Sequence, residues 1–337
     1  MAENKAEKTI VVVGTETLLG REVRDVLAAT SLGEDMRLVA AEEQGIGTLT
    51  EKGGEAAFLI KLTPASLQNA GAIILAGPGD TSEDVIELKP AAPLVDLTYA
   101  AEEQPHARLR APMVERSLGS QAPAIPKDAL HVVAHPASIA IALVLGRLHG
   151  VFPVRRAVVQ IFEPASERGS AGIDELQKQT VSLFSFKTMP KEVFDNQLSF
   201  SLLARLGDAA AVKLEDVEAR IERHLASLLA LASRAPMPSL RLIQAPVFHG
   251  YSLSFWIELD QNPGVAAIEQ TLSETFVEVR SRDVEPPNNV GVAGQNEIMV
   301  GAVSVDRNQP NAFWMWMALD NLRLTAQNAA MVVRDLI

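Results

Sequence analysis

The 337-residue sequence contains no cysteine. This absence excludes disulfide bonds, thiolate metal sites and thiol nucleophiles. The sequence also lacks an apolar run of the roughly 18 residues that a membrane-spanning helix needs, because its best candidate, "IAIALVLGRLHG", is interrupted by Gly146, Arg147 and His149. The N-terminal segment "MAENKAEK" is polar and has no signal-peptide core. We therefore expect a cytoplasmic protein with no membrane partner.

Positive charge is scarce as well. The chain has 30 Lys and Arg against 42 Asp and Glu, which gives a formal net charge of −12. Binding to a phosphate backbone needs clustered Lys and Arg, so we expect no nucleic-acid partner. The six His are scattered without a His-x-x-x-His pair or an acidic cluster, so no metal site is expected.

What is present is a hydrophobic content of 47%, enough for a sizeable core, and a length that suits two domains. Apolar segments without polar alternation predict strands that are covered on both faces. These segments lie at residues 9–13, 36–43, 70–77, 93–99 and 130–135. A Gly-containing turn and the helical stretch 21–30 follow the first strand. Such alternation predicts a Rossmann-type, doubly wound parallel sheet in an α/β fold.

The pattern changes after residue 150. The segments 155–165, 239–259 and 296–306 read as longer strands with more alternation, which indicates a mostly antiparallel sheet. Helical stretches at 171–184 and 213–233 lie between them, and residues 312–337 read as a strand followed by a helix. The second half is therefore expected to form an α+β domain.

Several motifs occur in an order that is typical of one family. They are "VVVG" with "LGREV", "AHPAS" at the place of an Asn-Pro-x-Cys elbow, "SERGSAGIDELQKQT", "APVFHGYS", "NEIMVG" and "DNLRLTAQNAAMVV". On these motifs the chain resembles the aspartate-semialdehyde dehydrogenases over nearly its whole length, and in particular their cysteine-less Usg-type branch. The resemblance implies a dinucleotide-binding domain over residues 1–135 and 318–337. It implies an α+β substrate and dimerisation domain over 136–317, through which the chain forms a homodimer.

The resemblance also implies where the family's catalytic roles fall. In the family a Cys thiolate attacks the aldehyde, a His acts as acid and base, an Arg holds the substrate carboxylate, and hydride passes to NADP. These three positions are Ser138, Tyr251 and Gln244 in this sequence. A Lys on the helix that leads to the substrate site aligns with Glu218.

These replacements remove the chemistry of each role. A serine hydroxyl, unlike a thiol of pKa ~8.5, needs an adjacent base. A tyrosine of pKa ~10 is a poor general base near neutrality, and glutamine cannot form the bidentate pair of an arginine with a carboxylate. We therefore predict a catalytically inactive homologue that acts as a binding or regulatory dimer. Its candidate partners are a small-molecule ligand and an active paralogue. The alternative is an NADP-dependent dehydrogenase of aspartate semialdehyde or a related aldehyde, serving lysine, threonine and methionine biosynthesis with altered catalytic residues.

The cofactor loop "GTETLLG" is altered too. Gly14 and Gly20 match the family's Gly-x-x-Gly-x-x-Gly turn, but Thr17 replaces the middle glycine and would crowd a pyrophosphate. Glu16 adds a negative charge beside a helix N-terminus, where it favours helix capping and opposes an anion. The remaining candidate cofactor contacts are Leu18, Leu19 and Asn321. The sequence leaves NADP binding open.

Other interpretations of single residues stay open at this point. Ser138 would equally serve as the N-cap or a first-turn residue of the following helix. His135 or His249 could act as a base to Ser138 in a hydrolase-like pair, although no acid that would orient the histidine is visible in the sequence. Arg168 could bind an anion or be a solvated loop residue. Two further features are Arg241, expected on the strand face opposite Gln244, and residues 313–317, expected in the sheet core or an interface.

Overall fold

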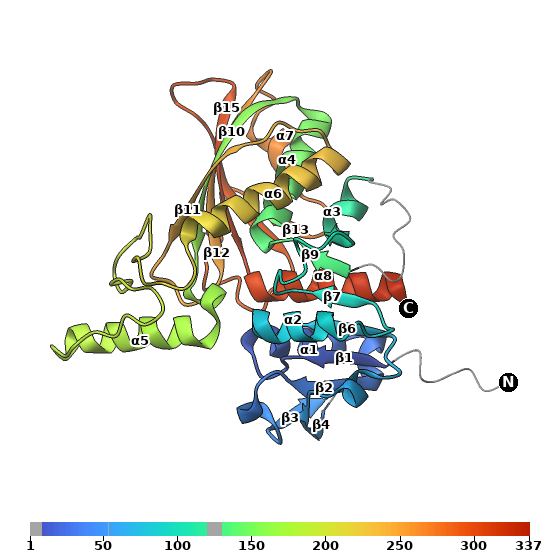
Figure 1. The fold of residues 1–337 in the computed structure, drawn as a ribbon. Helices are drawn as coiled ribbons and strands as arrows, with labels where there is room; N and C mark the ends of the chain where they lie inside the picture. The colour runs from blue at the N-terminus through green and yellow to red at the C-terminus, as the bar shows by residue number, and fades with distance from the viewer. Residues whose placement is uncertain (1–8, 53, 120–129) are drawn as a thin grey trace. The chain divides into compact units, whose positions relative to one another are not determined.

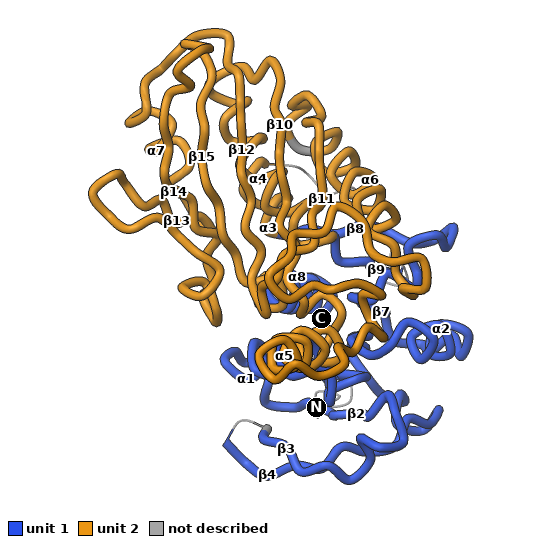
Figure 2. Tube along the Cα trace, turned by 90° about the vertical axis from the view of Figure 1, so that its left-hand side faces the viewer, with its two compact units in different colours: residues 1–112, 121–134, 325–337 blue, residues 113–120, 135–324 orange. Residues whose placement is uncertain are grey.

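The computed structural model describes residues 9–52, 54–119 and 130–337, and the chain divides into two compact units (Figures 1 and 2). Unit 1 comprises Met1–Pro112, Gln121–Ala134 and Thr325–Ile337, and unit 2 comprises Met113–Ser120 and His135–Leu324. The segment "MAENKAEK", on which the signal-peptide argument rests, lies outside the described residues.

Unit 1 is built on a seven-stranded sheet in the order β5-β2-β1-β6-β7-β9-β8, in which every pair of neighbours is parallel. Its strands are β1 (Ile10–Val13), β2 (Met36–Ala40), β5 (Ile60–Lys61), β6 (Ala72–Leu75), β7 (Leu94–Asp96), β8 (Ala107–Arg110) and β9 (Leu130–Val133). A small hairpin, β3 (Leu49–Lys52) and β4 (Glu55–Phe58), lies apart from this sheet. The predicted Rossmann-type parallel sheet is confirmed.

Apolar layers cover both faces of this sheet. Ile10 and Val12 of β1 point into one layer, which contains side chains of α1 (Leu18–Ala28) and α8 (Asn321–Leu336). Val11 and Val13 point into the other, which contains Val85 of α2 (Gly79–Glu87). Because both faces of β1 are buried, its sequence shows no polar alternation.

Unit 2 contains a six-stranded mixed sheet in the order β11-β10-β12-β15-β14-β13. The strands are β10 (Val154–Glu163), β11 (Ser239–Gln244), β12 (Tyr251–Leu259), β13 (Val277–Val279), β14 (Ile298–Val305) and β15 (Ala312–Leu319). The β10–β11 and β13–β14 pairs are parallel and the other three are antiparallel. The predicted α+β character of this unit is confirmed.

The segment 239–259 forms two strands rather than one. Residues 245–250 turn the chain between β11 and β12, and Gly250 adopts φ +83°. A side chain at Gly250 would place its Cβ 2.8 Å from the carbonyl oxygen of Asn289, so only glycine fits this turn without strain.

The helices of unit 2 are α3 (Pro112–Ser117), α4 (Pro136–Val151), α5 (Gly169–Phe184), α6 (Leu214–Ala232) and α7 (Val265–Leu272). Figure 1 shows α4, α6 and α7 on one side of the sheet. Helix α4 is buried from Pro136 to Leu148, which explains why its sequence is apolar on every face. Over the described residues, no helix combines the length and apolar character needed to cross a membrane.

Candidate functional site

Ser138, the residue at the expected thiol position, lies in the first turn of α4 and is completely buried. The N-cap of this helix is His135, whose Nδ1 accepts a hydrogen bond of 3.2 Å from the amide of Ala137. Of the two structural interpretations of Ser138, the N-cap is therefore wrong and the first-turn position is correct. The Ser138 hydroxyl donates to the backbone oxygen of Ile221 on α6 at 2.9 Å, so its proton is held by a carbonyl rather than by a base.

His135 is held by several neighbours in unit 2. Its backbone N–H donates to Nδ1 of His224 at 3.0 Å. Its ring meets the ring of Tyr251 edge-on, with centroids 5.9 Å apart, and its Nε2 lies 4.0 Å from a carboxylate oxygen of Glu167. The interactions of His135 therefore tie α4 to the loop after β10 and to the start of β12.

Tyr251 and Gln244 are the other two residues at which the resemblance predicts altered catalytic roles, and both contact Glu163 at the end of β10. The Tyr251 hydroxyl donates to Oε1 of Glu163 at 3.3 Å, and the Gln244 side-chain amide donates to the Glu163 backbone oxygen at 2.9 Å. Arg168 donates to both carboxylate oxygens of Glu163, at 2.9 and 3.4 Å. The Glu163 side chain has no exposed surface and that of Arg168 is 9% exposed, so this is a buried ion pair.

Glu163 is a site residue that the sequence reasoning missed. Ala157, Val159, Ile161 and Glu163 are the buried alternate residues of β10, so the period of two places Glu163 on the core face. Burial raises the pKa of Glu163, although Arg168 and Tyr251 act in the opposite direction. The Arg168 side chain is consequently a buried partner of this carboxylate rather than a solvated loop residue.

A second acid, Glu167, lies beside this pair. Its Oε1 accepts a hydrogen bond of 2.6 Å from the side-chain amide of Asn321. Burial, followed by the repulsion of Glu163, raises the pKa of Glu167 to about 7, while Asn321, Arg168 and His249 act in the opposite direction. Asn321, which the sequence suggested as a cofactor contact, is thus engaged inside unit 2.

His249 also interacts with an acid and a serine. Its Nε2 lies 2.9 Å from Oδ2 of Asp320, and its Nδ1 lies 3.2 Å from the hydroxyl of Ser166. Burial alone would raise the pKa of Asp320, but hydrogen bonds from His249 and from the amides of Arg323 and Gly294 hold it below its ordinary value. The serine that contacts His249 is thus Ser166, whereas the sequence offered His249 as a possible base for Ser138.

The contacts and exposure of three other candidates, Glu218, Arg241 and the segment 313–317, are also defined. Glu218 on α6 accepts from the amide of Leu242 at 2.5 Å and lies 3.7 Å from Arg241, so it ties α6 to β11. Arg241 is exposed, whereas Gln244 is fully buried. In the segment 313–317, Trp314 and Trp316 alternate with three buried side chains, and Trp314 is 43% exposed.

The cofactor loop lies in unit 1, between β1 and α1. Gly14 has φ +85°, and a Cβ there would lie 2.3 Å from Gly77, so the loop needs glycine to pass β6 closely. The Thr17 hydroxyl caps α1 by accepting from Gly20 N at 2.9 Å, and lies 2.9 and 2.8 Å from the carbonyl oxygens of Gly14 and Ala76. Leu18 and Leu19 are the first two residues of α1.

Glu16 does not cap α1, contrary to the expectation from sequence. Its Oε1 accepts from the amides of Ala41 and Glu42, at 2.7 and 2.9 Å, directly after β2. Its Oε2 is buried without a hydrogen-bond partner in the described structure. Thr17 is the capping residue instead, because its hydroxyl is the group within reach of the amide three residues ahead.

The position of Glu16 tests the fit of NADP. In dinucleotide-binding folds the end of the second strand recognises the ribose 2′ group, and an arginine there accommodates a 2′-phosphate. This chain places the carboxylate of Glu16 at that point, next to the exposed Glu42 and Glu43. Negative charge and occupied amides do not fit a 2′-phosphate.

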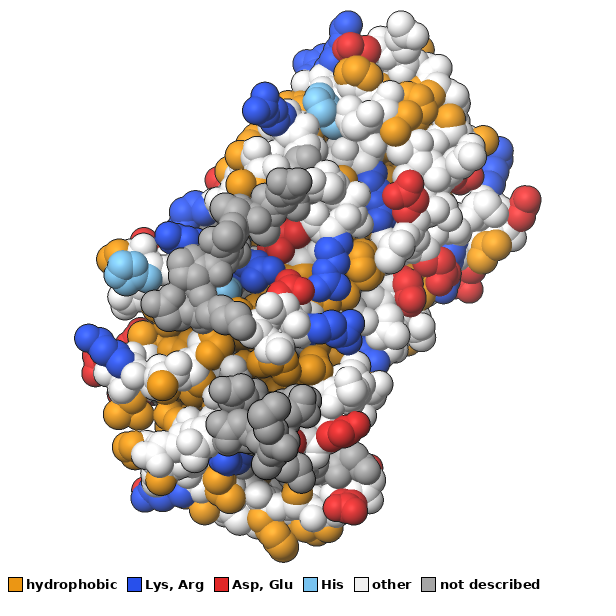
Figure 3. All heavy atoms as spheres, turned by 90° about the vertical axis from the view of Figure 1, so that its right-hand side faces the viewer, with side chains coloured by type: hydrophobic (Ala, Val, Ile, Leu, Met, Phe, Trp, Pro, Cys, Tyr) orange, Lys and Arg blue, Asp and Glu red, His pale blue; other side chains and the backbone are white. Residues whose placement is uncertain are grey.

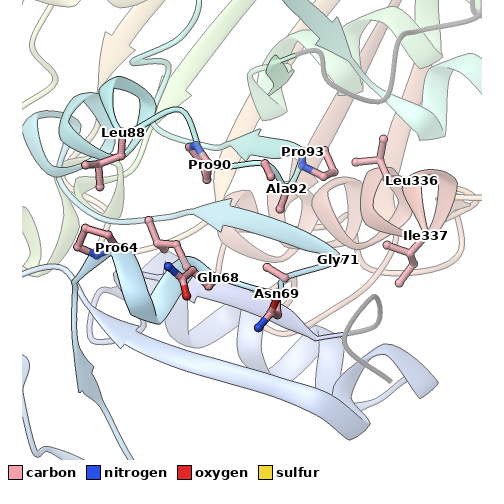
Figure 4. Close-up of a pocket in the computed structure, with 13 residues that line it drawn as sticks. Pro64, Gln68, Asn69, Gly71, Leu88, Pro90, Ala92, Pro93, Leu336 and Ile337 are labelled. Atoms are coloured by element: carbon pink, nitrogen blue, oxygen red, sulfur yellow. The ribbon is translucent and has the colours of Figure 1, made fainter. Parts of the chain in front are cut away.

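Unit 1 also has an open pocket of about 810 Å³, shown in Figure 4. Pro64, Pro90, Pro93 and Ile337 are among its lining residues, most of which are apolar. The pocket lies at the N-terminal ends of β6 and β7, whereas the cofactor loop follows the C-terminal end of β1. None of the residues proposed from the sequence lines it.

Charges and metal-binding side chains are dispersed in the described structure. On the face drawn in Figure 3, Lys and Arg side chains lie in small groups among acidic and apolar ones. Over residues 9–52, 54–119 and 130–337, no group of three or more His, Asp and Glu is arranged to hold a metal ion.

A chain that combines a Rossmann-type parallel-sheet unit with an α+β unit has the fold of a dehydrogenase-like protein. The chain matches the family described as the semialdehyde dehydrogenase dimerisation domain over residues 145–324, more than half of its length, and it belongs to that family.

Similarity to single proteins agrees with this assignment. The aspartate-semialdehyde dehydrogenase of Rickettsia bellii is 24% identical over 338 aligned positions, covering 97% of each chain. The USG-1 protein homolog of Pseudomonas aeruginosa is 29% identical over 247 positions, covering 72% of this chain and 71% of the homolog. The structure of a probable aspartate-semialdehyde dehydrogenase from Pseudomonas aeruginosa superimposes with a TM-score of 0.83 at 24% identity, covering 97% of each chain. The predicted resemblance is confirmed.

Proposed function

We propose that this protein does not catalyse NADP-dependent oxidation of aspartate semialdehyde and that it acts as a binding or regulatory dimer. The observation that supports this proposal best is the hydrogen bond from the Ser138 hydroxyl to the Ile221 carbonyl inside the core. A hydroxyl becomes a nucleophile only when a base removes its proton, and a backbone carbonyl cannot do this.

The neighbouring residues support the same proposal. The resemblance assigns the family's base and carboxylate-binding arginine to Tyr251 and Gln244, and both of these side chains contact Glu163. The guanidinium of Arg168, which contacts the same glutamate, is already paired with Glu163. A substrate carboxylate would therefore meet an internal carboxylate instead of a free cation.

The cofactor loop adds an independent argument. Glu16 occupies the amides after β2 and brings negative charge to the place where a 2′-phosphate would lie. We therefore propose that NADP is not a ligand of this loop in the natural chain.

An activity assay tests the proposal. Purified protein, incubated with aspartate semialdehyde, phosphate and NADP, should give no turnover above the uncatalysed rate. An active cysteine-containing relative prepared in the same way is the control. A turnover in the ordinary enzyme range of roughly 1 to 1000 per second would refute the proposal.

The main alternative is a dehydrogenase that uses altered residues in lysine, threonine and methionine biosynthesis. The double variant Ser138→Cys and Tyr251→His separates the two ideas, because it restores the thiol and the imidazole together. If the natural chain is inactive and the variant gains activity, the remaining pocket still accepts the substrate. Activity in the natural chain that the double substitution abolishes would favour the alternative.

We further propose that the helix-free face of the unit 2 sheet pairs with a second copy. Val158 and Trp314 are each 43% exposed on this face and, with Gln160, Ser254 and Trp256, line a pocket of about 260 Å³. The indole N–H groups of Trp256 and Trp314 both donate to Asp306, at 3.0 and 2.7 Å, which holds the two rings in place. These strands fall inside the segment that matches the dimerisation-domain family.

Sedimentation equilibrium tests the dimer. The natural chain should sediment as a dimer, and Val158→Asp should weaken it at least tenfold, because a buried unpaired carboxylate is costly. Leu231→Asp, on an exposed position of α6, is the matched control and should not change the assembly. A monomer at micromolar concentration would contradict the homodimer. A complex that forms only with an active paralogue would identify that paralogue as the partner.

A further inference from the structure

Ser166, His249 and Asp320 form a hydrogen-bonded chain in unit 2, separate from the Ser138 position. The Ser166 hydroxyl lies 3.2 Å from Nδ1 of His249, and Nε2 of His249 lies 2.9 Å from Oδ2 of Asp320. A nucleophile, a base and an acid that orients the base are the three elements of a serine hydrolase triad, which is recognised by geometry rather than by sequence order.

Backbone pairing fixes this arrangement. The amides of Ala165 and Ser166 donate to the carbonyl oxygens of Val247 and Phe248, at 2.8 and 3.0 Å, so the serine loop is held against the histidine loop. His249 precedes β12 and Asp320 follows β15, and these two strands pair through Tyr251 and Leu319. All three side chains are therefore carried by elements with fixed mutual positions.

Hydrogen bonds also define the role of each group. Asp320 is 5% exposed and accepts from the amides of Gly294 and Arg323, at 2.8 and 2.9 Å, so it is rigidly held. An ionised Asp320 retains the proton on Nε2 of His249, which leaves Nδ1 to accept from the serine. The side-chain amide nitrogen of Asn321 lies 3.2 Å from the Ser166 oxygen and donates to Oε1 of Glu167 at 2.6 Å, so it helps to hold the serine oxygen in place.

We propose that Ser166 is the nucleophile of an acyl-transfer site with His249 as its base and Asp320 as the group that orients the base. Ser166 Oγ attacks an ester carbonyl and passes its proton to His249 Nδ1. The tetrahedral intermediate expels the alkoxide, which takes that proton from His249. Water then attacks the acyl-serine, His249 takes the proton of the water and returns it to Ser166, and the acid is released.

The exposure of Ser166 and His249 and the charges near them limit the class of substrate that this site can accept. Ser166 is 2% exposed and the His249 side chain is 26% exposed, so an acyl group must reach the hydroxyl from the histidine side and must be small. Asp320 within the triad and Glu167 beside it disfavour anionic substrates. Small uncharged esters such as acetyl esters fit these limits.

A fluorophosphonate probe tests the proposal on the intact natural chain. Peptide mapping by mass spectrometry should find one covalent adduct, on Ser166, and p-nitrophenyl acetate should be hydrolysed above the buffer rate. Ser166→Ala should abolish both signals. His249→Gln and Asp320→Asn should slow labelling by about 100-fold or more, because general-base catalysis contributes that much.

The matched control is Ser227→Ala, which removes an exposed serine on α6 that donates to a backbone carbonyl. This variant should label and hydrolyse like the natural chain. The proposal is overturned if Ser166 in the natural chain is not labelled, or if His249→Gln, with a melting temperature like that of the natural chain, labels at the same rate. Dehydrogenase activity and dimer formation are measured separately, so failure here leaves the proposed function unaffected.

Discussion

Unit 1 and unit 2 each contain a glutamate that is held by hydrogen bonds, but they stabilise it differently. Glu16 in unit 1 is held by two backbone amides, whereas Glu163 in unit 2 is paired with a guanidinium inside the core. Backbone amides remain in place whether or not the glutamate is there, so the unit 1 contact adds little to the fold. A buried ion pair leaves an uncompensated charge when one partner is removed. The two sites should therefore respond unequally to single substitutions.

The largest expected effect comes from Arg168→Ala in unit 2. Glu163 would lose its cation while remaining fully buried, and the free energy of unfolding should fall by about 3–5 kcal/mol. Urea denaturation near neutral pH measures this change. Arg168→Lys keeps the positive charge, so its free energy of unfolding should fall by less than that of the alanine variant. If Arg168→Ala does not fold, the lysine variant can be compared with the natural chain instead.

Arg241→Ala is the control for this experiment. Arg241 is paired with Glu218 at 3.7 Å and its side chain is 64% exposed, so its loss should cost less than about 1 kcal/mol. Equal losses for Arg168→Ala and Arg241→Ala would contradict the distinction between a buried and an exposed pair.

The next effect is a pH dependence that Glu167 of unit 2 introduces. Glu167 has a pKa of about 7 in the folded chain against an ordinary value of 4.5, so the folded state binds its proton more tightly than the unfolded state. Its contribution to stability is fully present below the ordinary pKa and is lost as the pH rises through about 7. The loss is on the order of 3 kcal/mol, at about 1.36 kcal/mol per pKa unit.

Glu167→Gln should remove this loss. Between about pH 5 and pH 7.5, the variant should lose less stability than the natural chain by roughly 2–3 kcal/mol in chemical denaturation. Glu222→Gln on the exposed face of α6 is the control and should leave the profile unchanged. Parallel profiles for the natural chain and Glu167→Gln would mean that Glu167 titrates like a solvated acid.

The smallest expected effect lies in unit 1. Here the substitution should strengthen the binding of a ligand, whereas the substitution of Arg168 weakens the fold. Glu16→Ala frees the amides of Ala41 and Glu42, so it should gain affinity for 2′-phosphorylated nucleotides by about 1–3 kcal/mol, the range of hydrogen bonds to charged groups. Isothermal titration with NADP and adenosine 2′-monophosphate measures this gain, and NAD shows whether the phosphate is required.

Two further variants sharpen the test of Glu16. Glu16→Gln keeps an acceptor on the amides but removes the charge, so it should gain less than the alanine variant. Glu43→Gln removes a neighbouring exposed charge without freeing an amide and should gain least. Binding of NADP by the natural chain as tightly as by Glu16→Ala would refute the role of Glu16.

The strands that could be predicted from the sequence are those that are buried on both faces. The five apolar segments of unit 1 became β1, β2, β6, β7 and β9, because burial on both faces leaves a continuous apolar run. The edge strands β5 and β8 were not predicted. Ile60 and Lys61 are exposed, and β8 carries two arginines, so neither strand has a distinctive pattern.

Family motifs pointed to single residues of the candidate site, and the catalytic roles assigned to them stay predictions. Ser138, Gln244 and Tyr251 could be located by their position in family motifs, and Glu163 was within reach of the period-two pattern of β10. The chain of Ser166, His249 and Asp320 could not be predicted, because its members are 83 and 71 residues apart and meet only through loop and strand pairing. The sequence identifies Glu16 as a negative charge in the cofactor loop. The direction in which its side chain points could not be predicted, because it depends on the path of the loop around Gly14.

The hydrogen bond between Ser138 and Ile221 also bears on what a thiol at this position would do. The substitution Ser138→Cys replaces a good hydrogen-bond donor by a weak and larger one. A cysteine introduced alone would therefore loosen the contact between α4 and α6 while Tyr251 and Gln244 were unchanged. The fold itself thus favours serine over cysteine at the start of α4, whatever chemistry either side chain could support.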